Sequence, residues 1–385
     1  MSFFAELRRR NVFKFGAAYA VVASRFAMKR IGRKFSAMLL VMAAPSLYGH
    51  HSVGPNFDLA QEIVLMGAVI TEFKFVNPHV YLYVEVPGEK GAIADWRCEM
   101  AAASRLKRRG WTAETLVPGQ TISIDGSPGR REENVCHVTT ITREDGSILA
   151  EYAGRPTPAE ASTALASDAV IRSRPAYLSN GQPNLRGPWV STQPSLDMPE
   201  IEPTAAGEQA GAGLVRHFDS PVLRCQPTNI LFDWIFERMT NDIYQDDDTI
   251  TLQYGYLDIV RTIHLGRSEH PTTNSPSALG HSIGRWENDV LVVDTIGFER
   301  GVLDHVGRSA GFPMHSDQWH VVERYEVEAN GRTLTRTYTF DDPLFMQGTY
   351  AGQDSASLTT EQYAPYDCEE LSGKNNQRDA DLGRQ

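Results

Sequence analysis

Three charged side chains sit on strand faces that are otherwise apolar, and they could form a catalytic centre. The stretches LDIVRTIHL, VLVVDTI and VVERYEV each contribute one of them: Arg261, Asp294 and Glu323. Successive strand residues point to opposite faces, and a buried charge is costly unless it is paired. We therefore expect the three to meet. They are either a structural ion cluster, or outward-facing charges, or a polar centre in which Asp294 or Glu323 is acid or base and Arg261 orients a ligand.

Histidines crowd the same region. His281 stands in ALGHSIGRW and His315 in PMHSDQWH, where His320 follows, and His270 precedes a proline. We expect His281 and His315 in loops that lead into strands at the mouth of a barrel, where functional side chains are common. Both join the candidate catalytic set. A surface or core position without a catalytic role is the competing interpretation.

A metal site is predicted at the start of the mature chain. If a signal peptidase cuts after Gly49, His50 offers a free amine and an imidazole. With His51 or His79 of the NPHV segment, this gives a nitrogen-rich site suited to copper or zinc. Cleavage after Ser46 would remove the amine ligand. The alternative is that the histidine pair belongs to a loop or caps a barrel.

The N-terminal sequence predicts export. From Met28 the chain reads MKRIGRKFSAMLLVMAAPSLYG, a basic segment and then an apolar core too short to span a bilayer. We interpret residues 28–49 as a signal peptide and residues 1–27 as a spurious or fused segment. Residues 1–23 resemble the start of bacterial membrane-anchored tetratricopeptide and cyclase-like regulators, so retention of residues 1–49 would anchor the protein to a membrane. Otherwise the protein is expected to be periplasmic or secreted.

The distribution of charge along the chain indicates which classes of partner the protein could bind. Residues 1–49 hold nine of the 37 Lys and Arg residues and one of the 48 acidic residues, which leaves 28 basic and 47 acidic side chains in the body. Because nucleic-acid binding needs a basic surface, we expect no nucleic-acid partner. A small-molecule ligand suits this acidic body better. The sequence lacks the nucleotide-binding glycine motifs.

Alternating apolar patterns predict an all-β protein with minor helix. Residues 50–150 contain short strands and one helix, which suggests a small OB-like barrel. Residues 151–186 are rich in Ala, Ser and Pro and read as a linker. Residues 187–371 contain successive hairpins, two of which are expected to turn at Asn288-Asp289 and Asn330-Gly331. These hairpins predict a lipocalin-like antiparallel barrel. Residues 372–385 form a polar tail that we expect to be disordered.

The four cysteines fit an oxidising compartment. No C-x-x-C pair is present, so a zinc ribbon or thioredoxin motif is not expected. Of the three possible connectivities we favour Cys98–Cys136 and Cys225–Cys368, which place one disulfide within each domain. Buried free thiols are the alternative.

Residues 50–148 carry a specific combination of motifs: HHSVGPNFD, NPHVYLYVEV, RRGW and LVPGQTISIDG. They resemble a family of secreted bacterial domains of unknown function. The motifs GPWV, GHSIGRWENDVLVVDTIGF, HSDQWHVVER and YDCEE resemble a C-terminal region often joined to that family. The resemblance implies export and a β architecture but no established activity. This chain departs from it in CQPTNILFDWIFERM, where relatives are rich in Gly and Pro.

These observations lead to one principal hypothesis and three others. We expect an exported two-domain β protein that binds a small, fairly apolar molecule in its C-terminal barrel. An isomerase, lyase or hydrolase without a cofactor would use the inward charges and histidines. A periplasmic copper- or zinc-binding protein would use His50, His51 and His79. A scaffold without pocket chemistry is the last alternative.

Overall fold

The computed structural model describes residues 53–54, 56–88, 91–149, 165–192, 200–272, 275–303 and 313–370. Within these residues the chain is mostly strand with a few short helices, which confirms the predicted all-β class with minor helix. Segments 1–27, 28–49 and 372–385, whose roles were predicted above, lie outside the described residues. None of the helices in the described residues is long and apolar enough to cross a bilayer.

The first barrel is built from residues 63–149. Its strands are β1 (Ile63–Lys74), β2 (Tyr81–Pro87), β3 (Ile93–Glu99), β4 (Thr121–Pro128), β5 (Val135–Arg143) and β6 (Ile148–Leu149), with helix α3 (Ala103–Lys107) after β3. They pair in the order β3-β2-β1-β4-β5-β6, and an additional β3–β5 pairing closes the ring. Strand alternation places Leu82, Val84 and Ile124 in its core. The Cys98–Cys136 disulfide joins β3 to β5 at a paired position, which confirms the predicted bridge.

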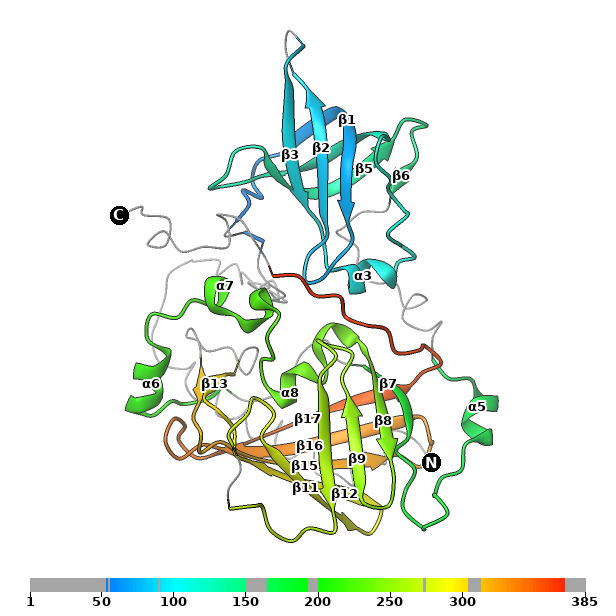
Figure 1. The fold of residues 1–385 in the computed structure, drawn as a ribbon, viewed down its shortest axis with the longest axis vertical. Coiled ribbons are helices and arrows are strands. Elements are labelled where there is room, and N and C mark those ends of the chain that lie inside the picture. Colours follow the sequence, from blue (N-terminus) through cyan, green and yellow to red (C-terminus); the bar gives the residue numbers. More distant parts are fainter. Residues whose placement is uncertain are drawn as a thin grey trace, which may run out of the picture. The chain divides into compact units, whose positions relative to one another are not determined.

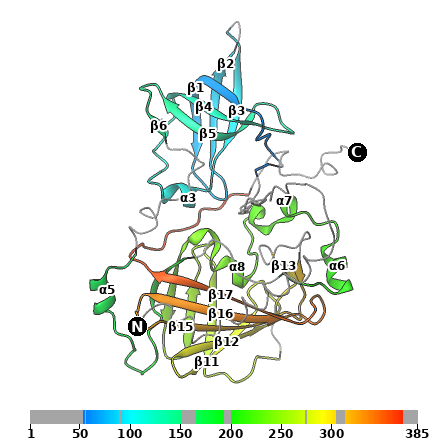
Figure 2. The same ribbon diagram turned by 180° about the vertical axis from the view of Figure 1, so that it is seen from behind.

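The second barrel is a closed ring of nine strands, in the order β10-β11-β12-β15-β16-β17-β7-β8-β9. The strands are β7 (Gly187–Ser191), β8 (Thr240–Gln245), β9 (Thr249–Gln253), β10 (Val260–Leu265), β11 (His281–Glu287), β12 (Val290–Ile296), β15 (His320–Val327), β16 (Thr333–Asp341) and β17 (Thr349–Leu358). In Figure 1, β8 and β9 cross in front of β15–β17 as two walls of this barrel, and Figure 2 shows β15–β17 from the other side.

One pair of neighbours in the second barrel is parallel, which corrects the prediction of a purely antiparallel barrel. β10 and β11 run in the same direction, with Ile263 paired with Ser282. Parallel neighbours cannot be joined by a tight hairpin, so the chain needs a long return connection, here residues 266–280. The predicted hairpins that turn at Asn288-Asp289 and Asn330-Gly331 are confirmed by the β11–β12 and β15–β16 pairings.

Short helices precede and interrupt the strands of the second barrel along the sequence. They are α5 (Asp168–Ser173), α6 (Ala205–Gly211), α7 (Arg216–Asp219), α8 (Ile230–Asp233) and the 3₁₀ turns η2 (Pro221–Arg224) and η3 (Phe236–Arg238); the short pair β13 (Gly301–Val302) and β14 (Met314–His315) forms a separate ribbon. In and just after α8, Phe232 and Trp234 are buried in the barrel core. The Cys225–Cys368 disulfide, also predicted, ties the chain before α8 to the C-terminal segment.

Residues 165–186 of the predicted linker are described, and they pack on the second barrel. The Ala166 N–H donates to the Leu358 carbonyl at 3.0 Å, and both Ala166 and Leu185 lie in the barrel core. The side chain of Arg332 donates to the Ala166 carbonyl at 2.7 Å. This part of the segment therefore contributes to the packing of the second barrel.

Candidate functional site

Four ionisable residues share the outer face of neighbouring strands in the second barrel. They are His264 of β10, His281 of β11, Asp294 of β12 and His320 of β15. Each alternates with inward residues of its strand, such as Ile263, Ser282, Thr295 and Val321, which are all buried. The register pairs Asp294 with Ile283 of β11 and with Val322 of β15. The outward side chains of β11, β12 and β15 therefore lie next to one another on the outer face. We call this group, together with His270, the histidine cluster.

Asp294 lies between two imidazoles of the histidine cluster. Its Oδ1 is 2.9 Å from Nε2 of His270 and its Oδ2 is 3.0 Å from Nε2 of His320. Hydrogen bonds from His320 and His270 hold the pKa of Asp294 below its usual range, so the carboxylate is ionised at neutral pH. The same hydrogen bond to Asp294 raises the pKa of His320. Asp294 is therefore an anionic anchor for two rings.

His270 reaches the cluster from the return connection between the parallel strands β10 and β11. Its Nδ1 is 2.9 Å from Nδ1 of His281, and the ring of His264 stacks on that of His281 with centroids 5.2 Å apart. Burial and the neighbouring His270 and His264 lower the pKa of His281. Because the connection between β10 and β11 is not a strand, alternation gave no signal for His270.

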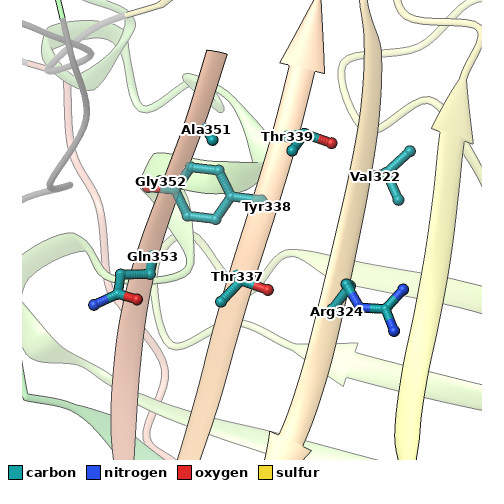
Figure 3. Close-up of a pocket in the computed structure, with 8 residues that line it drawn as sticks. All are labelled: Val322, Arg324, Thr337, Tyr338, Thr339, Ala351, Gly352 and Gln353. Carbon is teal, nitrogen blue, oxygen red and sulfur yellow. The ribbon is translucent and has the colours of Figure 1, made fainter. Parts of the chain in front are cut away.

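An open hollow of about 400 Å³ lies on the outer face of β15, β16 and β17. Figure 3 shows its lining: Val322 and Arg324 of β15, Thr337–Thr339 of β16 and Ala351–Gln353 of β17. Val322 is the register partner of Asp294 on one side and of Thr339 on the other. The hollow therefore continues the same outer face on which the histidine cluster lies.

The interior of the second barrel holds a different set of charges. Arg261 is paired with Glu323, and Glu323 also accepts from Arg336 at 3.2 Å, while Arg336 is paired with Asp354. Arg261 also donates to Ser282 at 3.0 Å, to Thr295 at 2.8 Å and to the Tyr254 hydroxyl at 3.4 Å, and Tyr325 donates to Glu323 at 2.7 Å. Although burial opposes ionisation, the two guanidiniums hold the pKa of Glu323 below its ordinary value.

This interior network brings together Arg261 and Glu323, as the sequence predicts, but it excludes Asp294. Asp294 lies on the outer face of β12, where Leu291, Val293 and Thr295 point inward. The expected placement of Asp294 beside Arg261 is therefore wrong. β12 carries apolar residues on both faces, so the alternation pattern could not show which face is internal. Arg336 and Asp354 were missed, although each shares a strand face with apolar residues, Arg336 with Leu334 and Tyr338 and Asp354 with Ala356 and Leu358, and could have been found in the same way.

His315 does not join His281. It lies in β14, only 2% exposed, with its ring stacked on that of Trp319 at 4.4 Å between centroids. Burial lowers the pKa of His315 to about 4, so its ring is neutral at physiological pH. The expected position in a barrel mouth is corrected: the short β13–β14 ribbon takes His315 into a packed aromatic cluster that includes Phe298.

The predicted metal site is only partly described. His50 and His51 lie outside the described residues, and Nδ1 of His79 contacts the carboxylate of Glu99. In the described ranges, no group of three or more His, Cys, Asp or Glu side chains could hold a metal ion. The copper or zinc site of His50, His51 and His79 stays a prediction.

The comparisons with known proteins concern the first barrel. Residues 38–137 match a family described as a family of unknown function (DUF6152). This agrees with the resemblance of residues 50–148 to a domain family without an established activity. The comparison with curated proteins gave no match.

Proposed function

We propose that this protein is exported and that its second barrel binds a small molecule on its outer wall. The ligand would occupy the hollow of β15–β17, with Asp294 and His320 as polar groups at its border. The single observation that carries this proposal is the hollow of about 400 Å³ whose lining residue Val322 is the register partner of Asp294. Pockets of this volume suit small ligands.

The charged groups inside the barrel are less suited to binding a small ligand than the residues of its outer wall. The carboxylates of Glu323 and Asp354 accept hydrogen bonds from Arg261 and Arg336. Polar groups that already satisfy one another have little capacity left for a ligand. Neither the hollow of β15–β17 nor a second one of about 330 Å³ beside β7 and β8 is lined by these charges. We therefore place the predicted ligand on the wall and not in the interior.

The lining of the hollow indicates the kind of ligand. Val322 and Ala351 offer apolar surface, whereas Arg324, Thr339 and Gln353 offer hydrogen-bonding groups. A small molecule with an apolar body and one acidic or hydrogen-bond-accepting group fits this mixture. The ligand is therefore more polar than the fairly apolar molecule expected from the sequence.

Binding is tested by calorimetric titration of the full-length protein with 8-anilinonaphthalene-1-sulfonate, which combines an apolar body with an anionic group. We expect saturable binding that Thr339→Trp abolishes, because the indole would fill the hollow. Thr335→Trp is the matched control: Thr335 lies on the same outer face of β16 but does not line the hollow. No saturable binding, or equal binding by both variants, would contradict the proposal.

Export is supported by the two disulfides, since such bridges persist in oxidising compartments. Expression of the full-length chain in a bacterium, followed by N-terminal sequencing of periplasmic protein, tests it. We expect a mature chain that starts at Leu47 or His50. Intact chains found only in the cytoplasm would contradict export, and a start at Leu47 would remove the amine ligand from the predicted metal site.

A further inference from the structure

Asp294 determines which nitrogen of His270 carries a proton. An ionised carboxylate only accepts hydrogen bonds, so Nε2 of His270 must donate to Oδ1 of Asp294, 2.9 Å away. In neutral His270 the other nitrogen, Nδ1, then has a lone pair. Nδ1 of His281 lies 2.9 Å from it and must carry the proton between them. The network therefore leaves Nε2 of His281 unprotonated, as a base.

The ring of His281 is fixed from two sides. His264 stacks on it with an interplanar angle of 17°, and His270 holds its Nδ1. Within the described part of the chain, no hydrogen bond is recorded for Nε2 of His281, and the residue is only half-buried. A basic nitrogen on a ring that is oriented by its neighbours and only half-buried is an arrangement suited to general-base catalysis.

We propose that Asp294, His270 and His281 form a proton relay that makes Nε2 of His281 a general base toward small carbonyl compounds, with esters as the simplest substrates. This activity goes beyond the proposed binding function. It rests on that function only for the position of the part of the substrate that lies away from the carbonyl group. His281 is the catalytic residue in this proposal. His270 and Asp294 are positioning residues that act through it.

The relay balances for ester hydrolysis. Nε2 of His281 takes a proton from a water molecule as the water oxygen bonds to the ester carbonyl carbon. The Nδ1 proton of His281 passes to Nδ1 of His270, which becomes an imidazolium beside the Asp294 carboxylate. The proton then returns along the same path to the leaving oxygen as the bond between the carbonyl carbon and that oxygen breaks. The products are a carboxylic acid and an alcohol, and the residues regain their first state.

The surroundings of His281 determine its pH response. The charged or titratable groups around it are His264 of β10, Arg267 and His270 of the return connection, Asp294 of β12, and His320 of β15 with its neighbour Asp341. Burial and the nearby His270, His264 and Arg267 lower the pKa of His281. The rate of base catalysis should therefore reach its plateau at a pH below the value of about 6.5 for free histidine.

The kinetic test uses the full-length protein and p-nitrophenyl acetate. We expect hydrolysis faster than by free imidazole at the same concentration, and a loss of about 10²-fold in kcat for His281→Gln. Asp294→Asn should lower kcat by about 10-fold with little change in KM, because it removes the charge that stabilises protonated His270. Imidazole added to His281→Ala should restore activity. The control His137→Gln lies in the first barrel and should keep the wild-type rate.

Nitrogen-15 NMR tests the relay without any substitution. Long-range proton–nitrogen spectra of the wild-type protein should show the Nε2–H form of His270 and the Nδ1–H form of His281. An Nε2–H form of His281, or hydrolysis no faster than by free imidazole, overturns the relay. Wild-type hydrolysis by His281→Gln overturns it as well.

Failure of the relay can be distinguished from failure of the proposed binding function. If Thr339→Trp abolishes dye binding while His281→Gln hydrolyses the ester normally, binding stands and the relay falls. If His281→Gln loses activity while Thr339→Trp changes neither dye binding nor KM, the relay stands and the hollow is not the binding site.

Discussion

Arg261 and Glu323 form an ion pair inside the second barrel, where their side chains are 2% and 0% exposed. They lie on β10 and β15, which are separated in the ring by β11 and β12. Glu323 also accepts from Arg336, so one carboxylate serves two guanidiniums. The pair therefore links two strands that are not neighbours in the barrel, and its energetic role can be tested directly.

Glu323→Leu should lower the free energy of unfolding by about 3–5 kcal/mol, because it leaves buried guanidinium charge without its partner. Urea denaturation measures this loss. The double variant Arg261→Met, Glu323→Leu should be more stable than the single variant, since it removes both charges. Disruption of the exposed Arg285–Glu287 pair by Arg285→Met is the control, and should change stability by less than about 1 kcal/mol. Equal losses from the buried and exposed pairs would contradict this role.

His315 should make the protein less stable in acid. Its folded pKa of about 4 lies below the unfolded value of about 6.5, so the stabilisation is present above pH 6.5 and is lost as pH falls toward 4. The loss is about 3 kcal/mol for this single group. His315→Phe, which keeps a ring on Trp319, should flatten the dependence of unfolding free energy on pH in this window. An unchanged slope, equal to that of a Thr335→Val control, would show that His315 is not responsible.

The two disulfides should differ in their effect on stability. They close loops with sequence separations of 38 and 143 residues. In the chain-entropy description, closing these loops stabilises the folded state by about 4 and about 5 kcal/mol. Cys98→Ser with Cys136→Ser should therefore destabilise the protein less than Cys225→Ser with Cys368→Ser, as measured by chemical denaturation. The reverse order would indicate that residual structure or packing at the cysteines dominates.

Gly352 should be intolerant of a side chain because of Tyr338. A Cβ at Gly352 would lie 2.6 Å from the Tyr338 hydroxyl oxygen and 2.7 Å from its ring, and Figure 3 shows the two residues side by side. Gly352→Ala should cost about 1–3 kcal/mol of stability through overpacking. In a double-mutant cycle, Tyr338→Leu should relieve most of this cost, and Ala351→Ser on the same strand serves as the control. A purely additive cycle would argue against the contact.

Several features followed from local sequence. Alternation predicted the strands, and Asn-Asp and Asn-Gly pairs predicted two hairpin turns that the register confirms. Alternation also placed Arg261 and Glu323 on the inner face, because most apolar residues of their strands lie on one face. These predictions succeed because side-chain direction in a strand and turn preference depend on a few neighbouring residues.

The histidine cluster was decided by tertiary structure. Asp294 could not be assigned to a face from the sequence of β12. Because β10 and β11 are parallel, a long connection joins them, and it brings His270 to the outer face beside His281. Strand register and the path of a long connection depend on contacts between residues that are distant in sequence. The amino-acid sequence by itself thus predicted the all-β class, the favoured pairing of the two disulfides and the contact between Arg261 and Glu323. Only the closed barrel decided that Asp294 would meet His270 and His320 on its outer wall, because register and barrel closure are long-range properties of the chain.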